Sequence, residues 1–570
     1  MNGYVVFMAL NWLFAPGWLK RTCKIFSLHC FRFLLLVCVI FTGQVRNVSA
    51  ENWIYTVQPG DNLWTLTEKY LIDMSYWQPL RRLNNVVDPL HIPPGTKLQI
   101  PVRWLNKLPI IARVNTIHGQ AELIEAGNGK AMPLSPGAFV FMGDTLETKA
   151  EATLIVEFVD GSTLLLQPES RLELNYLSIF GNTGMVDTRI HLNQGRLETQ
   201  VEKKQGPASR FEISTPAGIT SVRGTDYRVG VEPTSELSQT EVLEGGVNVM
   251  SAGKKKLIPK GYGTIASRHE PPKPPIPLLD AVDTQSFPAV FDRVPVQFVL
   301  PENQAIKGYR LQIANTESFD NVLFDKQYTS HQLRGPDLPD GDYYGHLRGI
   351  DEQGLEGKNA LYSFTINARP EAPILQEPKP DEGLIEETPP FVWARQEGIE
   401  KYHFQLARDK DFSDLVIDLP ELVDAHVDQG YKLELKQYYW RVACISDSEG
   451  QGPFSDRQTF KRLSPPPQAE APAINDTTLV LRWPADLPGV TYHFQMAEDE
   501  SFAKPMIDKN LSVPTLEIDR PDGGEYFIRV STTYPDGFVG PFGKPQIIDV
   551  PYSGLYWWLL TLLPLAFLAL

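Results

Sequence analysis

The sequence predicts a mainly β, multidomain protein, and three observations support this prediction. Its 570 residues include 47 prolines and 42 glycines, which divide the chain into short segments separated by turns. Apolar and polar residues alternate within most of these segments, as they do in half-buried strands. A Tyr-x-x-Gln segment recurs at Tyr309, Tyr402 and Tyr492, which indicates an internal repeat. At roughly 100–200 residues per domain, three to five domains are expected.

Residues 1–50 are predicted to be a signal peptide or an N-terminal anchor. They hold five basic residues and no acidic one. The apolar run Phe33–Phe41 is too short to span a bilayer comfortably and has the length of a signal-peptide core. The small residues Val48–Ala50 precede Glu51, where cleavage is expected. An uncleaved anchor is the alternative.

Residues 51–103 are predicted to fold as a small β-α-α-β module. A turn at Gln58–Asp61 is expected to end its first strand. The expected elements, in order, are a strand at Ile54–Val57, a helix with Leu63, Leu66, Thr67 and Tyr70 on one face, a second helix at about Trp77–Leu83 and a closing strand at Lys97–Ile100.

This module resembles the LysM domain over its whole length. The residues that carry the resemblance are Tyr55, Val57, Gly60, Asp61, Leu63, Leu83, Asn84, Ile92, Gly95, Leu98, Ile100 and Pro101. The family binds glycans that contain N-acetylglucosamine, and in bacteria it binds peptidoglycan. The resemblance implies a groove between two turns, with Gly60, Asp61, Asn62 and Leu63 on one side and Pro89, Leu90, His91, Ile92 and Pro93 on the other.

The chemistry of these two turns suits such a ligand. Backbone N–H and C=O groups can hydrogen-bond acetamido groups, and we expect Leu63 and Ile92 to offer an apolar surface to the sugar faces. The alternative interpretation is structural. Gly60 and Gly95 would only permit tight turns, and Asp61 would cap the first helix. The two interpretations are compatible.

Residues 110–269 are predicted to form an all-β domain, as a sandwich, a barrel or a β-roll. Asp160-Gly161 lies between two alternating runs and is a strong hairpin signal. The expected strands include Ala121–Ile124, Thr153–Phe158, Ser162–Gln167, Arg171–Leu174, Thr188–Leu192, Arg210–Ser214, Tyr227–Val231 and Gly246–Met250.

This segment resembles the FecR domain over most of its length. The resemblance is carried by Gly137, Gly143, Asp144, Phe158-x-Asp160-Gly161-Ser162, Thr215-Pro216-x-Gly218, Val222-Arg223-Gly224-Thr225-Asp226-Tyr227 and Glu244-Gly245. The family is best known for relaying an outer-membrane signal to a cytoplasmic sigma factor, through a cytoplasmic region that precedes a membrane span. Here the stretch before the apolar run has no recognisable domain, so we expect an envelope interaction domain instead. Arg223 is expected to brace a turn through Asp226, and a binding role for Arg223 is the alternative.

A proline-rich segment and three repeats complete the body of the chain. Residues 270–283, which include EPPKPPIP, are predicted to be a stiff, extended spacer. The repeats at 284–369, 370–463 and 464–551 resemble fibronectin type III-like sandwiches. Their tyrosines, together with Trp393, Trp483 and the looser counterpart Phe298, are predicted core residues. Arg348, Arg441 and Arg529 end equivalent strands, and each is expected to pack against an aromatic face.

Residues 552–570 are predicted to form an apolar C-terminal helix that crosses a membrane. The segment carries no charge, and as a helix it would be about 28 Å long, close to the thickness of a bilayer core. Trp557 and Trp558 would lie at the membrane interface. Docking of the tail on a partner is the alternative.

No catalytic, metal or cofactor site is predicted. The sequence lacks H-E-x-x-H, G-x-S-x-G, C-x-x-C and phosphate-loop motifs. Cys444 lies on a predicted buried strand and is expected to be a small core residue. The acidic run Asp409–Asp414 resembles a calcium loop, but the other two repeats do not keep its acidic residues.

The sequence therefore predicts a non-catalytic, exported protein of the periplasm or cell envelope. It would bind peptidoglycan through residues 51–103, present its β domains to an unknown envelope protein, and contact the membrane through its tail. A FecR-type signalling regulator and a peptidoglycan hydrolase are the alternatives. A net charge of −16 argues against nucleic acid. That charge is concentrated in residues 284–550, which hold 25 basic and 43 acidic residues.

Overall fold

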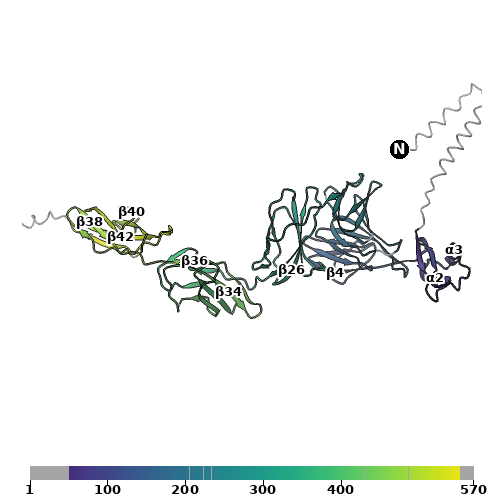
Figure 1. The fold of residues 1–570 in the computed structure, drawn as a ribbon, viewed down its shortest axis with the longest axis horizontal. Helices are drawn as coiled ribbons and strands as arrows, with labels where there is room; N and C mark the ends of the chain where they lie inside the picture. The colour runs from purple at the N-terminus through teal and green to yellow at the C-terminus, as the bar shows by residue number, and fades with distance from the viewer. Residues whose placement is uncertain are drawn as a thin grey trace, which may run out of the picture.

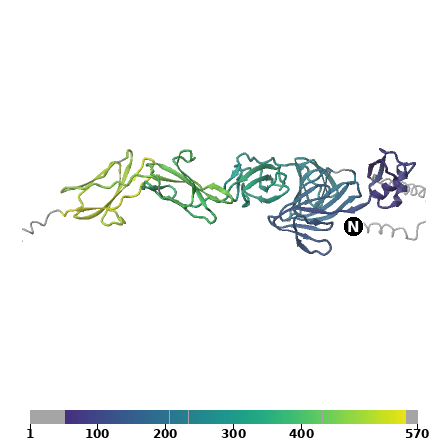
Figure 2. The same ribbon diagram turned by 90° about the horizontal axis from the view of Figure 1, so that it is seen from below.

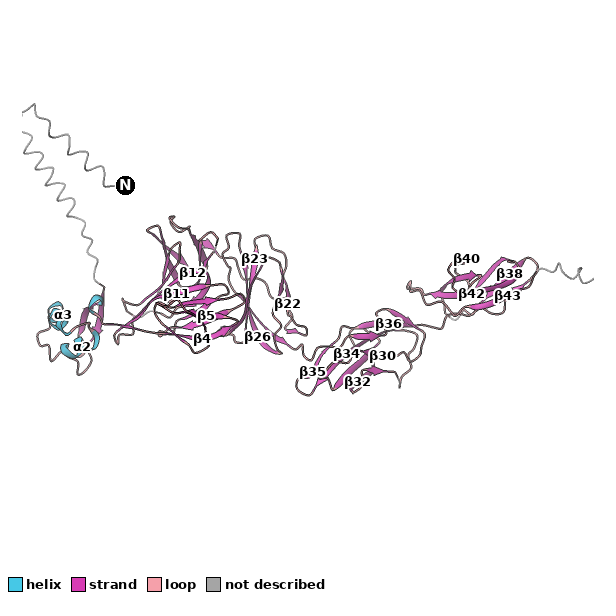
Figure 3. Cartoon of the chain, turned by 180° about the vertical axis from the view of Figure 1, so that it is seen from behind, coloured by secondary structure: helices cyan, strands magenta, loops and turns pink. Residues whose placement is uncertain are grey.

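A computed structural model describes residues 51–203, 206–222, 224–232, 234–428, 430–485 and 487–552. The domains follow one another along the long axis of the molecule, with the first module at one end and the third repeat at the other (Figure 1, Figure 2). Within the described residues, helices occur only in the first module, and the rest is strand and loop (Figure 3). The predicted mainly β, multidomain class is confirmed.

The first module has the expected β-α-α-β order. Strand β1 (Asn52–Thr56) pairs antiparallel with β2 (Lys97–Pro101). Between them lie α2 (Leu63–Tyr70), the 3-10 turn η1 (Met74–Tyr76) and α3 (Trp77–Leu83), and a second 3-10 turn, η2 (Val102–Trp104), follows β2. Four residues of α2, spaced at helical intervals, are buried as predicted: Leu63, Leu66, Thr67 and Tyr70.

The module shares its core with the domain that follows it. Phe180, Met185 and Ala208 of the second domain belong to the same apolar cluster as Leu63 and Leu66. Backbone hydrogen bonds from Ile72 N to Trp104 O (2.9 Å) and from Asn106 N to Tyr70 O (2.8 Å) fix the connection between the two domains. The first module therefore packs directly on the second domain and shares part of its apolar core with it.

The second domain is a closed barrel around one apolar core, built from two hydrogen-bonded sheets. Its strands are β3 (Lys107–Pro109), β4 (Ala112–His118), β5 (Ala121–Ile124), β6 (Ala131–Pro133), β7 (Phe139–Val140), β8 (Thr145–Thr148), β9 (Thr153–Glu157), β10 (Thr163–Leu166), β11 (Arg171–Phe180), β12 (Val186–Gln200), β13 (Arg210–Ser214), β14 (Ile219–Val222), β15 (Asp226–Val231), β16 (Ser238–Glu244), β17 (Gly246–Ser251), β18 (Lys254–Pro259) and β19 (Tyr262–Ala266). Strands β9 and β10 form the hairpin that Asp160-Gly161 predicted.

Strand β12 belongs to both sheets of this domain. Its first half pairs with β11 and β13, and its second half pairs with β10 and β15. The change occurs at Gly195, where φ is +84° and an added Cβ would lie 2.1 Å from Ser170 Oγ. Only glycine fits there, because the backbone is left-handed and a neighbouring strand lies against it.

The proline-rich segment is not a free spacer, which corrects the prediction for residues 270–283. Strand β20 (Ile276–Pro277) pairs with β19. Lys273 N donates to Ile265 O at 3.0 Å, and Leu278 is buried against Ile265 and Leu355. Extended prolines can pair on one side only, at a sheet edge. The segment therefore closes the edge of the second domain and delivers the chain directly onto the first repeat.

The three repeats are sandwiches of mainly antiparallel strands, and repeats 1 and 2 each contain one parallel pair. Repeat 1 contains β21 (Val290–Phe291), β22 (Gln297–Val299), β23 (Gly308–Ala314), β24 (Val322–Tyr328), β25 (Gln332–Arg334), β26 (Gly341–Ile350) and β27 (Ala360–Ile366). Repeat 2 contains β28 (Leu375–Glu377), β29 (Glu382–Leu384), β30 (Phe391–Trp393), β31 (Lys401–Ala407), β32 (Leu415–Leu422), β33 (His426–Val427), β34 (Gln437–Ser446), β35 (Gly450–Phe454) and β36 (Gln458–Arg462). Repeat 3 contains β37 (Ala473–Ile474), β38 (Thr478–Arg482), β39 (Thr491–Ala497), β40 (Ile507–Leu511), β41 (Thr515–Asp519), β42 (Gly524–Thr533) and β43 (Gln546–Val550).

The repeat cores contain the predicted aromatic residues. The rings of Trp393 and Tyr402 lie 5.5 Å apart, as do those of Trp483 and Tyr492, and Phe298 is buried in repeat 1. Cys444 is fully buried in the core of repeat 2, and burial raises the pKa of its thiol to about 12. Aromatic packing without disulfides thus forms these cores.

Two arginines pack between aromatic rings as predicted. The guanidinium carbon of Arg441 lies 3.9 Å from the ring centre of Phe412 and 4.1 Å from that of Phe454. In repeat 3, Arg529 lies 4.1 Å from Phe502 and 4.3 Å from Phe542. We call each of these two arrangements a Phe–Arg–Phe ladder.

The position assigned to Arg348 in this pattern was wrong. Arg441 is paired across the sheet with Gln405, and Arg529 with Gln495. The matching residue Gln312 of repeat 1 is paired with His346, which stacks on Phe319 at 3.5 Å between ring centres. Sequence spacing missed this because Arg348 lies only two residues farther along the same strand.

Some predictions fall outside the described residues. These are the leader 1–50, the tail 552–570 apart from Tyr552, and the role of Arg223. Among the helices that the structure does describe, none has the length and apolar character needed to cross a membrane.

Candidate functional site

Two turns of the first module meet at the N-terminus of α2. Leu63 N donates a hydrogen bond to Pro89 O at 2.8 Å, which joins the turn 60–63 to the loop 89–93. Gly60 has φ of +91°, and nothing lies near the position that a Cβ would take. The structure therefore brings together the two segments that sequence resemblance placed on opposite sides of a groove.

The polar side chains of the first turn are engaged in holding it. The Asp61 carboxylate accepts the Tyr55 hydroxyl at 2.6 Å and the Gln58 backbone N–H at 2.7 Å. Partial burial, followed by the bond to Asp61, raises the pKa of Tyr55. Asn62, rather than Asp61, caps α2: its Oδ1 accepts Thr65 N at 2.9 Å. Asp61 thus shapes the turn, which corrects the alternative interpretation of Asp61 as a helix cap.

Leu63 and Ile92 do not present the apolar surface that was expected of them. Leu63 is 0% exposed and Ile92 is 6% exposed, and both lie in the core of the module. Leu63 points inward because α2 packs through the face that Leu63 shares with Leu66. Of the predicted loop residues, Leu90 is 64% exposed and presents an apolar side chain at the surface.

The second turn is ordered by one carboxylate. Asp88 Oδ1 accepts Leu90 N at 2.9 Å, and Oδ2 lies 3.0 Å from His91 Nδ1. These two interactions, in that order, lower the pKa of Asp88. Leu90, His91 and Pro93 are exposed around this centre, and Pro89 is half-buried. The loop therefore offers a fixed apolar and polar surface beside Leu63 N.

Sequence reasoning missed an aromatic pair between α2 and α3. Trp64 on α2 is 53% exposed, and its ring centre lies 6.1 Å from that of Trp77 on α3. Arg81 Nε and Nη2 donate to Val86 O and Val87 O, at 3.0 and 2.9 Å, and tie α3 to the loop that follows it. Trp64 was detectable, because it lies between the buried Leu63 and Leu66 and must face outward on the helix.

A second constellation lies between the second domain and repeat 1. Glu356 is 1% exposed and is surrounded by four arginines. The distances from Glu356 are 2.6 Å to Arg310, 3.0 Å to Arg196, 3.2 Å to Arg228 and 3.4 Å to Arg348. Burial raises the pKa of Glu356, but the arginines, led by Arg196, outweigh burial and hold it well below its usual range.

Three further carboxylates complete this ion cluster. Glu198 lies 3.0 Å from Arg348, Glu241 lies 2.8 Å from Arg196, and Asp325 lies 2.6 Å from Arg310. The cluster thus places four arginines opposite four carboxylates, drawn from β12, β15 and β16 on one side and from repeat 1 on the other. Charges this deeply buried are tolerated only when each is paired. The arrangement joins two domains and offers no free nucleophile or base.

The acidic run in repeat 2 closes a turn. Asp409 accepts the backbone N–H groups of Asp411, Ser413 and Asp414, at 3.1, 3.1 and 2.7 Å. Its oxygens are therefore occupied by the loop itself. Within the described part of the chain, no group of His, Cys, Asp and Glu side chains is arranged to hold a metal ion.

Two family profiles match the chain. One, described as LysM domain, matches residues 55–101, and the other, described as FecR protein, matches residues 144–248. The chain contains a LysM domain and a FecR domain. Both are of non-catalytic kinds, and LysM domains generally bind peptidoglycan or related N-acetylglucosamine glycans. From here on, residues 51–103 are called the LysM domain and residues 110–269 the FecR domain.

Other comparisons add only distant likenesses. A search of curated proteins finds no match. A Parabacteroides distasonis protein assigned as an anti-sigma factor is 16% identical, with a TM-score of 0.20, and the alignment covers 23% of this chain and 58% of that one. A two-domain fibronectin type III segment of chicken tenascin is 13% identical, with a TM-score of 0.21, over 32% of this chain and 100% of that one.

Proposed function

We propose that this protein is a non-catalytic cell-envelope protein that binds peptidoglycan through its LysM domain and presents its β repeats to a protein partner. The observation that carries the proposal is the joining of the two turns at Leu63 N and Pro89 O, with Leu90 exposed beside them. Backbone polar groups and one apolar side chain suit an acetamido sugar, which has amide and apolar faces.

The packing of the LysM domain on the FecR domain supports this proposal. Its core continues into the FecR domain through Phe180 and Met185, and the FecR domain is joined to repeat 1 by the ion cluster. We call residues 51–369 the head. A glycan bound at the LysM end would therefore fix the orientation of the whole head, and repeats 2 and 3 would extend from it (Figure 1).

Co-sedimentation with insoluble peptidoglycan tests the glycan part of the proposal. The full-length protein is expected to pellet with peptidoglycan. Leu90→Asp should weaken binding by at least about tenfold, because it replaces an exposed apolar contact with a charge. Ile72→Asp is the matched control, because Ile72 is 58% exposed at the far end of α2. Equal binding by both variants, or no binding by the native protein, would refute the assignment.

A signal-transducing regulator is the second candidate, favoured by the FecR match at residues 144–248. Deletion of residues 552–570 should then change the expression of a regulon without affecting co-sedimentation. Zymography on peptidoglycan separates both candidates from a hydrolase, since only a hydrolase would clear the gel.

A further inference from the structure

Two open grooves flank one short segment at the joint between repeats 1 and 2. The first has a volume of about 580 Å³ and the second about 610 Å³. Both are lined by Arg293 of repeat 1 and by Ser455, Asp456 and Arg457 of repeat 2. Arg293 crosses the joint, with Nη2 donating to Phe454 O at 2.9 Å. The grooves are therefore two sides of one continuous surface.

Unpaired cations gather on this surface. Arg293 is balanced, since it lies 3.7 Å from Asp292 and 3.6 Å from Asp456. Lys410, Arg441 and Arg457 line the second groove, and none of them forms an ion pair with any residue that the structure describes. The second groove is thus lined by four cations, Arg293, Lys410, Arg441 and Arg457, and by two carboxylates, Asp292 and Asp456. A groove lined by more cations than carboxylates favours the binding of a carboxylate ligand.

The Arg441 guanidinium is oriented before any ligand arrives. Its Nε and Nη2 both donate to Gln405 Oε1, at 2.9 and 2.7 Å, and the rings of Phe412 and Phe454 cover its two faces. Within the described residues, Nη1 donates to no acceptor. A guanidinium held in this way loses little rotamer entropy when it pairs with a carboxylate.

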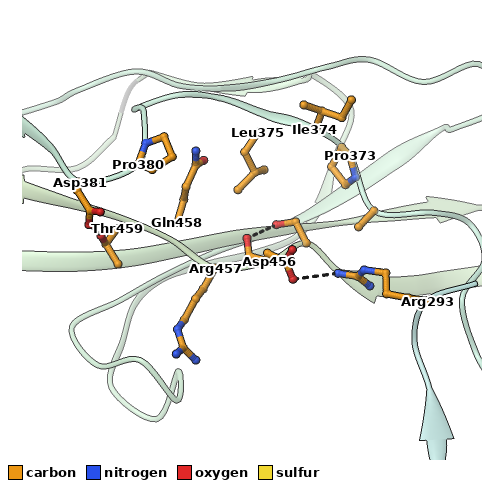
Figure 4. Close-up of a pocket in the computed structure, with 12 residues that line it drawn as sticks. Arg293, Pro373, Ile374, Leu375, Pro380, Asp381, Asp456, Arg457, Gln458 and Thr459 are labelled. Atoms are coloured by element: carbon orange, nitrogen blue, oxygen red, sulfur yellow. Dashed lines mark hydrogen bonds and ion pairs between the residues drawn. The ribbon is translucent and has the colours of Figure 1, made fainter. Parts of the chain in front are cut away.

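The first groove adds an apolar wall. Figure 4 shows Pro373, Ile374 and Leu375 along one side of the groove, across from the segment that carries Asp456 and Gln458. Arg457 extends away from them, on the other side of that segment (Figure 4). Ile374 is 74% exposed. A ligand that spans both grooves would thus meet an apolar contact and then a row of cations.

Repeat 3 provides an internal comparison for this surface. It keeps the Phe–Arg–Phe ladder with Arg529, but Glu500 stands in the position of Lys410, Lys544 in that of Asp456, and Pro545 in that of Arg457. Repeat 3 therefore keeps the ladder but not the cations at the positions of Lys410 and Arg457.

We propose that the joint between repeats 1 and 2 binds an extended acidic peptide segment of a protein partner. Its carboxylates would pair with Arg441, Lys410 and Arg457, and an apolar side chain would pack on Ile374. A peptide fits better than nucleic acid, because a peptide can place an apolar side chain on the exposed Ile374, whereas a phosphate backbone offers this wall no apolar contact. This inference specifies the protein-contact part of the proposed function and is independent of glycan binding.

Fluorescence anisotropy of the full-length protein tests the inference. The probes are a labelled Glu-Leu-Glu-Glu-Leu-Glu peptide and its Gln-Leu-Gln-Gln-Leu-Gln counterpart. The acidic peptide should bind at least about tenfold more tightly, and its affinity should fall as ionic strength rises. Lys410→Glu/Arg457→Glu should remove that preference, since both side chains are exposed and their exchange leaves the core intact.

Two controls keep the test decisive. Lys504→Glu/Lys509→Glu makes the same charge change on exposed positions of repeat 3, and it should bind like the native protein. Arg441→Gln should weaken binding of the acidic peptide, whereas Arg529→Gln should leave that binding unchanged. Equal affinity for the two peptides, an unchanged affinity in the joint variant, or equally tight binding of a DNA oligonucleotide would each overturn the inference. Peptidoglycan co-sedimentation is expected to be unaffected by all of these variants.

Discussion

The outer face of the main sheet is used in opposite ways by repeat 1 and by repeats 2 and 3. In repeat 1, Arg310 and Arg348 on this face are buried against the FecR domain. In repeats 2 and 3 the same face carries the Phe–Arg–Phe ladders. All three faces share one framework, in which a glutamine amide donates to an aspartate: Gln312 to Asp325, Gln405 to Asp418 and Gln495 to Asp508.

A few side chains convert this framework from an open face to a docked one. Arg310 occupies the position of His403 in repeat 2 and of His493 in repeat 3. Each histidine lies within hydrogen-bond distance of the framework aspartate of its own repeat, Asp418 or Asp508. Glu356 of repeat 1 is equivalent to Gln451 of repeat 2 and to Val539 of repeat 3. Each of the three pairs with a residue at or near the end of a long strand, which is Ile350, Ile445 and Thr533 respectively. A surface becomes an interface here when arginines and carboxylates are added in equal number, because an unbalanced charge could not be buried.

Removal of Glu356 should produce the largest effect. Glu356→Ala leaves four arginines buried without their common partner, and it is expected to destabilise the head by about 3–5 kcal/mol. Thermal unfolding followed by circular dichroism measures the loss. Gln451→Ala, the equivalent exposed position in repeat 2, should change stability by less than about 0.5 kcal/mol. Similar losses in both variants would show that the docked and open faces do not differ in this way.

The second-largest effect is expected at acidic pH, where the docked face of repeat 1 should lose stability. Burial, partly offset by Glu198 and reinforced by Arg348 and Arg228, lowers the pKa of His346 from 6.5 to about 4. The unfolded chain then binds the proton more readily than the folded one, so stability is complete above pH 6.5 and falls as the pH drops towards 4. The shift corresponds to roughly 3 kcal/mol.

Urea denaturation at a series of pH values checks this expectation. His346→Gln should flatten the profile of the head between pH 6.5 and 4. His331→Gln, a more exposed histidine of the same repeat, should leave it unchanged. A profile that is the same in all three proteins would contradict the assignment to His346.

The smallest effect is expected on an open face. Arg529→Ala removes the ladder of repeat 3 and two hydrogen bonds to Gln495, at 2.8 and 2.6 Å. A loss of about 1–2 kcal/mol is expected for that repeat. Hydrogen exchange of β39 and β42 measures it locally. Arg529→Lys should recover only part of the loss, because lysine has no planar face to stack.

The positions of most strands could be predicted because strand alternation is local. Ala121–Ile124 and Arg210–Ser214 have the predicted bounds, and the other predicted strands of the FecR domain overlap observed ones. The buried face of α2 also followed from helical spacing. The site was predicted less well. The two turns do meet, but Leu63 and Ile92 are buried and Leu90 and Trp64 are exposed, because the LysM core takes the side chains that its packing requires.

The sequence by itself determined the order of the modules, the sandwich repeats and their Trp and Tyr cores, because each depends on residue patterns within a short segment. Only the tertiary structure decided that the proline-rich segment joins a sheet, that the LysM core continues into the FecR domain, and that repeat 1 is docked while repeats 2 and 3 are open. These outcomes depend on which side chains meet across domains. Arg228 and Glu356 lie 128 positions apart in the chain, and no local pattern records that they form one ion pair.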